Sequence, residues 1–359
     1  MSPLIGFAIG LGALIVGAEW LVRGASRLAI AWRVPPLIVG LTVVAYGTSS
    51  PELAVSVQAA LSGQEGVALG NVIGSNIFNV LFILGVSALI IPLAVNEQLI
   101  RLDVPLMIGV SLVAYTMSLD GVISRLDGLI LVAGAMAYTF FLFRAGTEGA
   151  PEHLLSQKPP TWRNILLYIF LVLAGLGLLV VGSRWLVRAA VDTATALGVS
   201  PIVIGLTIVA AGTSLPEVVT SVVAALRKAR DIAVGNVVGS NLFNLLLILG
   251  ASAAVAPSGI PVPPSVKSFD LPIMLATAIA CLPIFYTNRR IERWEGGLFL
   301  AYYVLYTGYL VTSALGYPWV RDVEAAMLGV VLPLTAITLL VLFLGHRWRS
   351  QSPSAPPQT

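Results

Sequence analysis

Apolar stretches of about 20 residues recur along almost the whole chain, and each is long enough to cross a hydrocarbon layer about 30 Å thick. This feature limits the possible folds most strongly. The expected spans are residues 3–22, 35–61, 66–91, 103–119, 127–143, 164–183, 200–226, 232–256, 270–286, 295–314 and 323–345. Only 10% of the 359 residues are charged, against about 25% in soluble domains. The sequence therefore predicts an all-α integral membrane protein with eleven spans.

Basic residues in the expected loops predict the orientation. With the N-terminus outside, fifteen Lys and Arg residues fall in cytoplasmic loops and five in outside loops. Positive residues accumulate on the cytoplasmic side of membrane proteins. We therefore expect a multi-pass protein of the cell (inner) membrane, with the N-terminus outside and the C-terminus cytoplasmic. The net charge of +3 reports this topology and does not indicate nucleic-acid binding.

A long internal repeat divides the chain. Residues 34–85 align with residues 199–250 without a gap, and 30 of the 52 positions are identical. Shorter matches on both sides extend each repeat to about five spans. An odd number of spans inverts the second copy relative to the first, which is a known transporter architecture with its substrate site near the midplane.

The expected fold therefore has two inverted five-helix repeats, which form a ten-helix core, and an additional eleventh helix. We expect the first repeat at residues 1–143 and a cytoplasmic linker at 144–163. The second repeat should occupy 164–314, and residues 315–359 should form the extra helix and a disordered tail. The tail is polar and rich in proline, which is typical of disordered segments.

Each repeat carries the motif G-T-S-x-P-E in the middle of a span. Its residues are Gly47, Thr48, Ser49, Pro51 and Glu52 in the first copy, and Gly212, Thr213, Ser214, Pro216 and Glu217 in the second. Proline has no N–H and displaces the carbonyl four residues before it, so we expect a helix break that frees the carbonyls of Gly47 and Gly212. Free backbone groups are tolerated at membrane depth only where they face protein or a watery cavity.

The second motif, G-N-V-x-G-S-N-x-F-N, follows in the next span of each repeat. It contains Gly70, Asn71, Gly74, Ser75, Asn76 and Asn79, and then Gly235, Asn236, Gly239, Ser240, Asn241 and Asn244. The paired glycines predict close approach of another helix. Asn71, Asn76, Asn236 and Asn241 fit helix–helix contacts better than direct ion binding.

The two motifs supply only oxygen ligands, which are the ligands of hard cations such as Ca²⁺ and Na⁺. Charged side chains inside a bilayer are costly and mark ion pathways by default. We therefore expect Glu52 and Glu217 to be functional, whereas Glu19 should form a structural ion pair with Arg23. Four other acidic residues should lie at span ends near the interface: Asp103, Asp127, Asp270 and Glu295.

The doubled motifs resemble the α-repeats of the calcium/cation antiporter superfamily, specifically its sodium/calcium exchangers of the prokaryotic, potassium-independent type. The resemblance covers about residues 1–315. It implies that Glu52 and Glu217 are the central ion ligands. It also implies ligand oxygens from Thr48, Ser49, Thr213, Ser214, Ser75, Ser240, Asn79 and Asn244 and from the backbone carbonyls of Ala45 and Ala210. It implies further that the first and sixth spans slide across the core to alternate access.

One departure concerns Asn244, where potassium-dependent relatives, and some prokaryotic ones, carry aspartate, which argues against potassium co-transport. The expected function is secondary active exchange of Na⁺ for Ca²⁺, with both ions competing for one midplane site. An H⁺/Ca²⁺ antiporter, or one for another divalent cation, stays open as the alternative. We expect no cofactor and no partner beyond the ions and the lipid bilayer, and the sequence leaves the oligomeric state open.

Two other classes of protein fit less well. An intramembrane hydrolase would need a nucleophile, a base and an orienting group. The expected spans contain no His or Lys, and Cys281 is their single cysteine. We therefore expect a protein that is not an enzyme. A passive channel is possible in composition, but duplicated polar sites at the midplane suit alternating access better.

Overall fold

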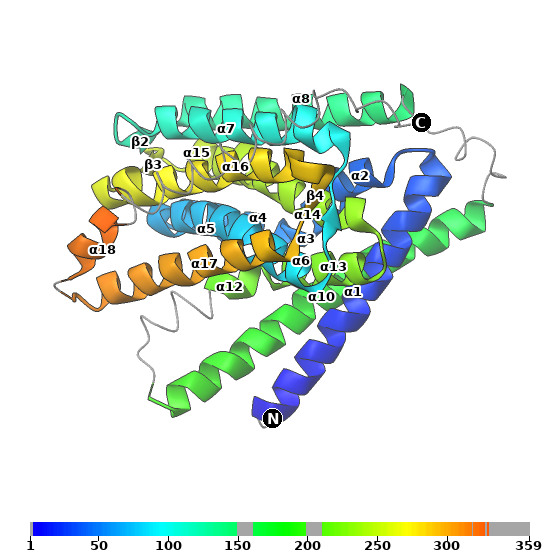
Figure 1. Ribbon diagram of the computed structural model, residues 1–359, viewed down its shortest axis with the longest axis horizontal. Coiled ribbons are helices and arrows are strands. Elements are labelled where there is room, and N and C mark those ends of the chain that lie inside the picture. Colours follow the sequence, from blue (N-terminus) through cyan, green and yellow to red (C-terminus); the bar gives the residue numbers. More distant parts are fainter. Residues whose placement is uncertain (1–2, 149–160, 199–209, 318, 327–328, 330–359) are drawn as a thin grey trace, which may run out of the picture.

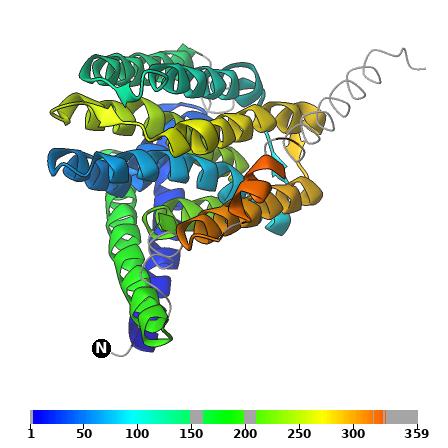
Figure 2. The ribbon, with the colours of Figure 1, turned by 90° about the vertical axis from the view of Figure 1, so that its left-hand side faces the viewer.

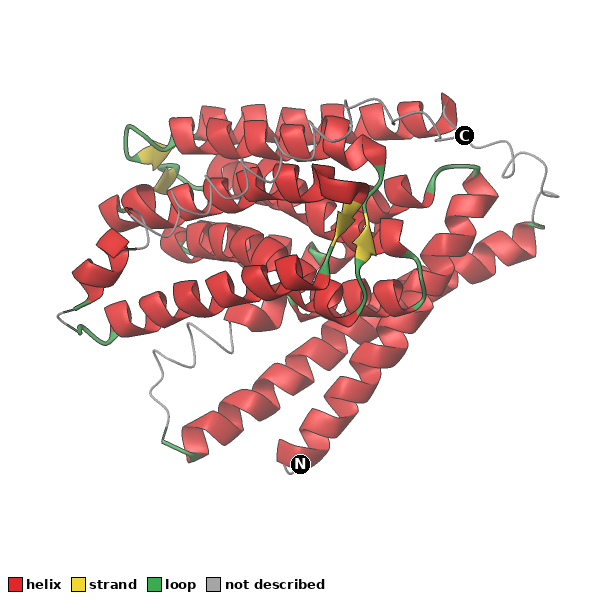
Figure 3. Ribbon diagram, viewed as in Figure 1, coloured by secondary structure: helices red, strands yellow, loops and turns green. Residues whose placement is uncertain are grey.

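The computed structural model describes residues 3–148, 161–198, 210–317, 319–326 and 329. Helices make up nearly all of this part of the chain, with two very short pairs of strands (Figure 3). Most helices lie side by side in one bundle, and two long helices cross it obliquely (Figure 1). This arrangement confirms the predicted all-α fold.

The N-terminal half contains the following elements in chain order: α1 (Pro3–Trp32), α2 (Pro36–Val39), η1 (Gly40–Val44), α3 (Ala45–Thr48), α4 (Ser50–Leu61), α5 (Glu65–Phe78), η2 (Asn79–Leu84), α6 (Gly85–Ile90), β1 (Leu93–Ala94), η3 (Leu99–Asp103), α7 (Val104–Met117), β2 (Val122–Ile123) and α8 (Arg125–Glu148). The segments η1, η2 and η3 are single π-helical turns between α-helical segments. Such turns are rare and often occur at functional sites.

The C-terminal half repeats this order: α10 (Trp162–Ala196), α12 (Ala210–Thr213), α13 (Leu215–Leu226), α14 (Arg230–Phe243), η5 (Asn244–Leu249), α15 (Gly250–Val255), β3 (Ile260–Pro261), η6 (Val266–Asp270), α16 (Leu271–Tyr286), η7 (Thr287–Arg289), β4 (Arg290–Ile291), α17 (Arg293–Ala314) and α18 (Val320–Ala326). The π-helical turns η5 and η6 correspond to η2 and η3 in the first repeat. The two halves therefore share the same local irregularities as well as the same motifs.

Eight helices in the described residues are long and apolar enough to cross a membrane, or nine if a bent pair counts as one span. The bent pair joins Pro36–Thr48 to Ser50–Leu61 at an angle of 48°. The eleventh expected span, 323–345, lies almost entirely outside the described residues, as do the start of the seventh span and most of the 144–163 linker. A multi-pass membrane protein follows from these helices.

The first and sixth helices are much longer than the predicted spans 3–22 and 164–183. Helix α1 continues to Trp32 and α10 to Ala196. The predicted first span ends at residue 22, just before Arg23. In the structure Ala25, Leu28 and Ala29 are buried along one face, and Arg27 points outward, which is the usual pattern of an amphipathic helix.

The two short sheets show how the halves are related. Strand β1 pairs antiparallel with β4, and β2 pairs antiparallel with β3. Since β3 is the repeat mate of β1 and β4 is that of β2, a two-fold rotation exchanges one sheet for the other. Each sheet therefore joins the two repeats, as an inverted pair of repeats requires.

Helices α1 and α10 form a pair of their own, which extends away from the rest of the bundle (Figure 2). They touch through glycines: a Cβ at Gly17 would lie 2.8 Å from the carbonyl oxygen of Gly175, and one at Gly10 would lie 2.9 Å from that of Gly182. Gly10 and Gly175 are repeat mates, and so are Gly17 and Gly182. The two contacts are therefore equivalent by symmetry and bring the helix backbones together.

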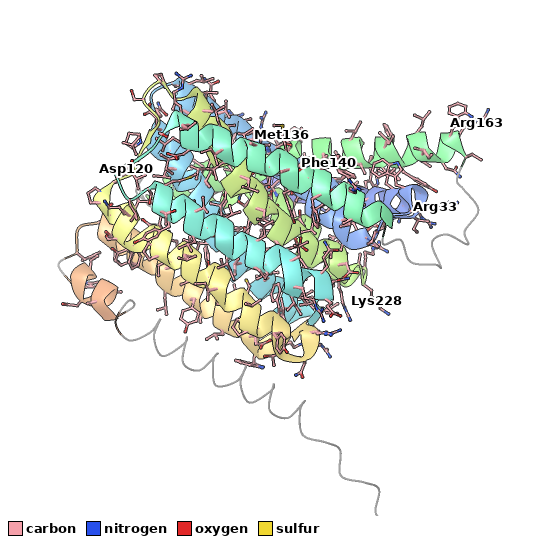
Figure 4. All side chains as sticks on the ribbon, turned by 90° about the horizontal axis from the view of Figure 1, so that it is seen from above. Arg33, Asp120, Met136, Phe140, Arg163 and Lys228 are labelled. Carbon is pink, nitrogen blue, oxygen red and sulfur yellow. The ribbon has the colours of Figure 1, made fainter. Side chains whose placement is uncertain are left out.

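The outer surface carries the features of a membrane-embedded bundle. Met136 and Phe140 on α8 are 65% and 69% exposed, and Figure 4 shows them on the flank between the charged ends. Exposed Arg33, Arg163 and Lys228 lie at one end of the bundle and Asp120 at the other (Figure 4). The apolar flank fits contact with lipid chains, and the charged ends fit the two aqueous sides.

Two of the four acidic residues expected at span ends, Asp103 and Glu295, are buried within the protein, with 0% and 3% of their surfaces exposed. Tyr138 donates a hydrogen bond of 2.9 Å to Asp103. Glu295 accepts a bond of 2.8 Å from the backbone N–H of Glu292 and so caps α17. These hydrogen bonds make the burial of both carboxylates tolerable. The position of the two residues at span ends could not predict either partner.

Candidate cation site

The G-T-S-x-P-E motifs form helix breaks with the same backbone shape in both repeats. Ser49 lies between α3 and α4 with φ −84° and ψ 6°, and Ser214 lies between α12 and α13 with φ −90° and ψ 8°. Pro51 and Pro216 occupy the first turn of the next helix, where a missing N–H breaks no intrahelical bond. The break therefore falls two residues before each proline, and the glutamate follows in the first turn of the next helix.

Glu52 and Glu217 are buried, with 2% and 1% of their surfaces exposed. Each is held by a serine from the opposite repeat. Ser214 donates a hydrogen bond of 3.1 Å to Oε1 of Glu52, and Ser49 donates one of 2.8 Å to Oε1 of Glu217. Because each bond joins positions more than 160 residues apart, the two motifs form one site.

The second motif joins the same site from α5 and α14. The hydroxyl of Ser75 lies 3.3 Å from that of Ser214, and the hydroxyl of Ser240 lies 3.1 Å from that of Ser49. Thr48 donates to the amide oxygen of Asn236 at 3.2 Å. These hydroxyls, together with Thr213, which lies 3.5 Å from the amide oxygen of Asn71, surround the glutamates with oxygen.

Asn79 and Asn244 begin the π-helical turns η2 and η5. Both are buried, and each donates its amide N–H across the repeat boundary. Nδ2 of Asn79 bonds Oδ1 of Asn241 at 3.0 Å, and Nδ2 of Asn244 bonds Oδ1 of Asn76 at 3.3 Å. Their own amide oxygens stay free of these bonds.

Four buried oxygens of the site receive no hydrogen bond from any residue that the structure describes. They are Oε2 of Glu52, Oε2 of Glu217, Oδ1 of Asn79 and Oδ1 of Asn244. Buried polar atoms are nearly always hydrogen-bonded, and exceptions call for an explanation such as a bound ion. All four belong to residues for which the sequence predicted ion binding, and they form two symmetry-related pairs.

The predicted carbonyl ligands have a different environment. The carbonyl oxygen of Ala45 accepts a bond of 3.0 Å from the N–H of Ser49, and it lies 3.3 Å from the Thr48 hydroxyl, whose single hydrogen can instead bond Asn236. The corresponding environment of Ala210 borders residues outside the described part. Roles for these two carbonyls as ion ligands stay predictions.

The freed carbonyl of Gly212 has a partner within the protein. It accepts a hydrogen bond of 2.6 Å from the hydroxyl of Ser183 on α10. The expectation that such a freed carbonyl must face protein or water is therefore met. The sequence could not show this partner, because the bond depends on how α10 crosses the broken helix.

Sequence reasoning missed two serines that support the site. Ser56 accepts a bond of 2.9 Å from Nδ2 of Asn71, and Ser221 accepts one of 2.9 Å from Nδ2 of Asn236. A serine four residues after the motif glutamate in both repeats was the available signal. The bonds agree with the structural role that the sequence favoured for Asn71 and Asn236.

The predicted ion pair of Glu19 is confirmed and has a second partner. Glu19 lies 2.9 Å from Arg23 in its own helix and 2.8 Å from Arg227 at the end of α13. The pair therefore links α1 to the core. It lies outside the cluster of site oxygens and has a structural explanation.

The fold and the site together define a class of protein. The described spans surround two buried carboxylates, hydroxyls and amide oxygens, which is a donor set for hard cations. The site joins two inverted repeats of membrane helices, an arrangement found in secondary transporters. These properties describe a membrane antiporter for cations.

The chain belongs to the sodium/calcium exchanger family. The family model described as sodium/calcium exchanger protein matches residues 2–144 and 167–312. The chain is 37% identical over 316 residues to the putative antiporter CaxA of Alkalimonas amylolytica, covering 85% of this chain and 97% of the relative. It is 32% identical over 336 residues to the sodium/calcium exchanger MaX1 of Methanosarcina acetivorans, covering 83% and 95%.

A solved structure shows the same fold. The sodium-calcium exchanger NCX_Mj, soaked with zero Na⁺ and Ca²⁺, superposes with a TM-score of 0.74 and 31% identity, and the match covers 84% of this chain and 97% of that chain. The family exchanges Ca²⁺ with other cations, so this chain is a transporter and not an enzyme.

Proposed function

We propose that this protein exchanges Na⁺ for Ca²⁺ by alternating access, with both ions competing for one site near the membrane midplane. The observation that carries this proposal is the buried pair Glu52 and Glu217, with four oxygens at the boundary between the repeats that have no hydrogen-bond partner among the described residues. A relative, MaX1, is named a sodium/calcium exchanger. Its name and the donor set support the same ions.

Charge accounts for the coupling. Two ionised glutamates give the site a formal charge of −2, which one Ca²⁺ or two Na⁺ neutralise. Burying an uncompensated charge is costly. The protein should therefore switch the site from one side of the membrane to the other far more readily when the site holds its ions. Ions that share ligands then exchange in turn and do not travel together.

Alternating access needs a part that moves past the site. Helices α1 and α10 form a separate pair, and their contact with each other is lined by glycines. Leu176 of α10 packs against Gly47, and Val187 of α10 packs against Gly212, so α10 covers both helix breaks. Sliding of this pair would change which side of the site is open.

The first test uses the glutamate itself. In liposomes with Na⁺ inside, purified protein should take up ⁴⁵Ca²⁺ when the outside Na⁺ is removed, and Glu52→Gln should abolish the uptake because the site loses half its charge. Glu65→Gln is the matched control, since Glu65 starts α5 and is outside the cluster. Uptake by Glu52→Gln at the wild-type rate would refute the site.

A second candidate, H⁺/Ca²⁺ exchange, is favoured by one observation. Each glutamate keeps one buried oxygen without a partner among the described residues, and a proton on that oxygen would also neutralise it. A pH gradient imposed without Na⁺ separates the two functions. We expect no Ca²⁺ uptake under that gradient, and strong uptake would identify H⁺ as the counter-ion.

A further inference from the structure

Two short chains of side-chain amides run outward from Asn79 and Asn244. Asn79 donates to Asn241 at 3.0 Å, and Asn241 donates through its own Nδ2 to the backbone carbonyl of Asn76 at 3.3 Å. Asn244 donates to Asn76 at 3.3 Å, and Asn76 donates through its Nδ2 to the sulfur of Met274 at 3.7 Å. All four asparagines are buried.

The ends of these chains determine the direction of every bond in them. A backbone carbonyl and a thioether sulfur can only accept a hydrogen bond. Asn241 must therefore turn its NH₂ group toward the carbonyl of Asn76, and Asn76 must turn its NH₂ group toward Met274. Their amide oxygens then face Asn79 and Asn244.

The consequence reaches the site. Because the amide oxygen of Asn241 faces Asn79, Asn79 must turn its NH₂ group toward Asn241 to bond it. The Oδ1 atom of Asn79 then points to the opposite side of its amide. The same reasoning applies to Asn76 and Asn244. The two oxygens left over are those without a partner among the described residues.

We propose that Asn76 and Asn241 are positioning residues that keep the oxygens, and not the NH₂ groups, of Asn244 and Asn79 turned toward the transported cation. The inference rests on the proposed function, because it takes Asn79 and Asn244 as cation ligands. A reversed amide would point N–H groups at a cation and remove one oxygen ligand. The chains therefore tune affinity without touching the ion.

The assignment predicts a specific pattern of rescue. Asn241→Leu removes the acceptor for Asn79 and should raise the Ca²⁺ dissociation constant about 10-fold to 100-fold, as loss of a supporting contact does at metal sites. Adding Asn79→Asp should cancel that effect, because both oxygens of a carboxylate can bind the ion and no orientation is left to hold. Adding Asn244→Asp should not cancel it.

The second chain gives the mirror experiment. Asn76→Leu should weaken Ca²⁺ binding by a similar factor, and Asn244→Asp should rescue it whereas Asn79→Asp should not. The two aspartate changes add the same charge to the same site, so each is the charge control for the other. Ca²⁺ binding is measured by equilibrium ⁴⁵Ca²⁺ titration of detergent-purified protein, and each double mutant is compared with its own aspartate parent.

Met274→Leu tests the same chain with a change that conserves volume and so preserves folding. It removes the sulfur acceptor and should raise the Ca²⁺ dissociation constant severalfold, though not in an Asn244→Asp background. Met107→Leu is the matched control. Met107 is the repeat mate of Met274, but it accepts no bond in the other chain. There Asn241, the repeat mate of Asn76, donates to the backbone carbonyl of Asn76.

The outcomes separate this inference from the proposed function. Unchanged Ca²⁺ affinity in Asn241→Leu and Met274→Leu would overturn the positioning role, as would equal rescue by both aspartate changes. If wild-type protein bound no Ca²⁺, or if Glu52→Gln bound it equally well, the site assignment itself would fail. Loss of binding in Glu52→Gln with no effect of the asparagine variants would overturn the positioning role alone.

Discussion

At the scale of single residues, the site depends on bonds that cross between the repeats. Glu52 is held by Ser214 and Glu217 by Ser49, so neither motif is complete without the other. Hydrogen bonds to charged groups contribute about 1.5–3 kcal/mol, more than those between neutral groups. The serines therefore both orient the glutamates and lower the cost of their burial.

Ser49→Ala should weaken Ca²⁺ binding about 10-fold, because a bond to a carboxylate is worth at least about 1.5 kcal/mol. Ser50→Ala is the control on the neighbouring residue. Its hydroxyl is exposed and bonds the carbonyl of Tyr46 in the adjoining helical segment at 2.8 Å, so its loss should change binding little. Equal effects of the two variants in a ⁴⁵Ca²⁺ titration would argue against the cross-repeat bond.

At the scale of elements, irregular turns and glycine contacts shape the core. The π-helical turns η2 and η5 begin at Asn79 and Asn244, where the extra residue per turn displaces the helix locally. The expected close approach at the paired glycines is observed in the second repeat, where Cβ atoms at Gly235 and Gly239 would lie 3.1 Å from the Leu37 side chain and 2.7 Å from the Leu41 carbonyl oxygen. At Gly70 and Gly74, no atom of the described residues lies within 4 Å of the Cβ position.

Gly17→Ala should destabilise the α1–α10 contact. Its Cβ would lie 2.8 Å from the carbonyl oxygen of Gly175 and 2.9 Å from the backbone nitrogen of Leu179, and overpacking of this kind costs about 1–3 kcal/mol. We expect a lower melting temperature in detergent and slower exchange in liposomes. Gly12→Ala, on the same helix with no described atom within 4 Å of its Cβ, should melt no earlier than wild type. If both variants melted at the wild-type temperature, α1 and α10 could move apart at Gly17 without loss of stability, and the prediction would be wrong.

At the scale of the whole molecule, two halves of opposite orientation surround one site. The short sheets join the halves, β1 with β4 and β2 with β3. Exposed basic residues Arg33, Arg163 and Lys228 gather at one end (Figure 4). We propose that this end is cytoplasmic and that the N-terminus is outside, because positive residues stay on the cytoplasmic side.

Single-cysteine labelling tests this orientation. Cys281 is the only cysteine of the sequence and is buried, so a Cys281→Ala background leaves no native thiol. A membrane-impermeant maleimide should label Asp120→Cys in intact cells, and Lys228→Cys only after the membrane is opened. The reverse pattern would place the N-terminus inside.

Much of the fold and of the site was open to prediction from the sequence alone. The repeat, its odd number of spans and the polar motifs within apolar segments are local patterns, and they indicated inverted helices and a cation site at Glu52 and Glu217. The family match and the NCX_Mj fold agree with the predicted fold and family. The length of α1 was underestimated because Arg23 and Arg27 interrupt the apolar stretch, although Ala25, Leu28 and Ala29 between and after them are buried.

Only the tertiary structure decided which side chains meet. Pairs such as Ser49 with Glu217, Asn79 with Asn241 and Ser183 with Gly212 join different helices, and the packing of those helices determines each of them. The structure also decided which oxygens keep no partner among the described residues. The sequence determined the chemistry of the site because residue type and spacing are local properties, whereas the direction of its donors and acceptors depends on contacts between distant segments.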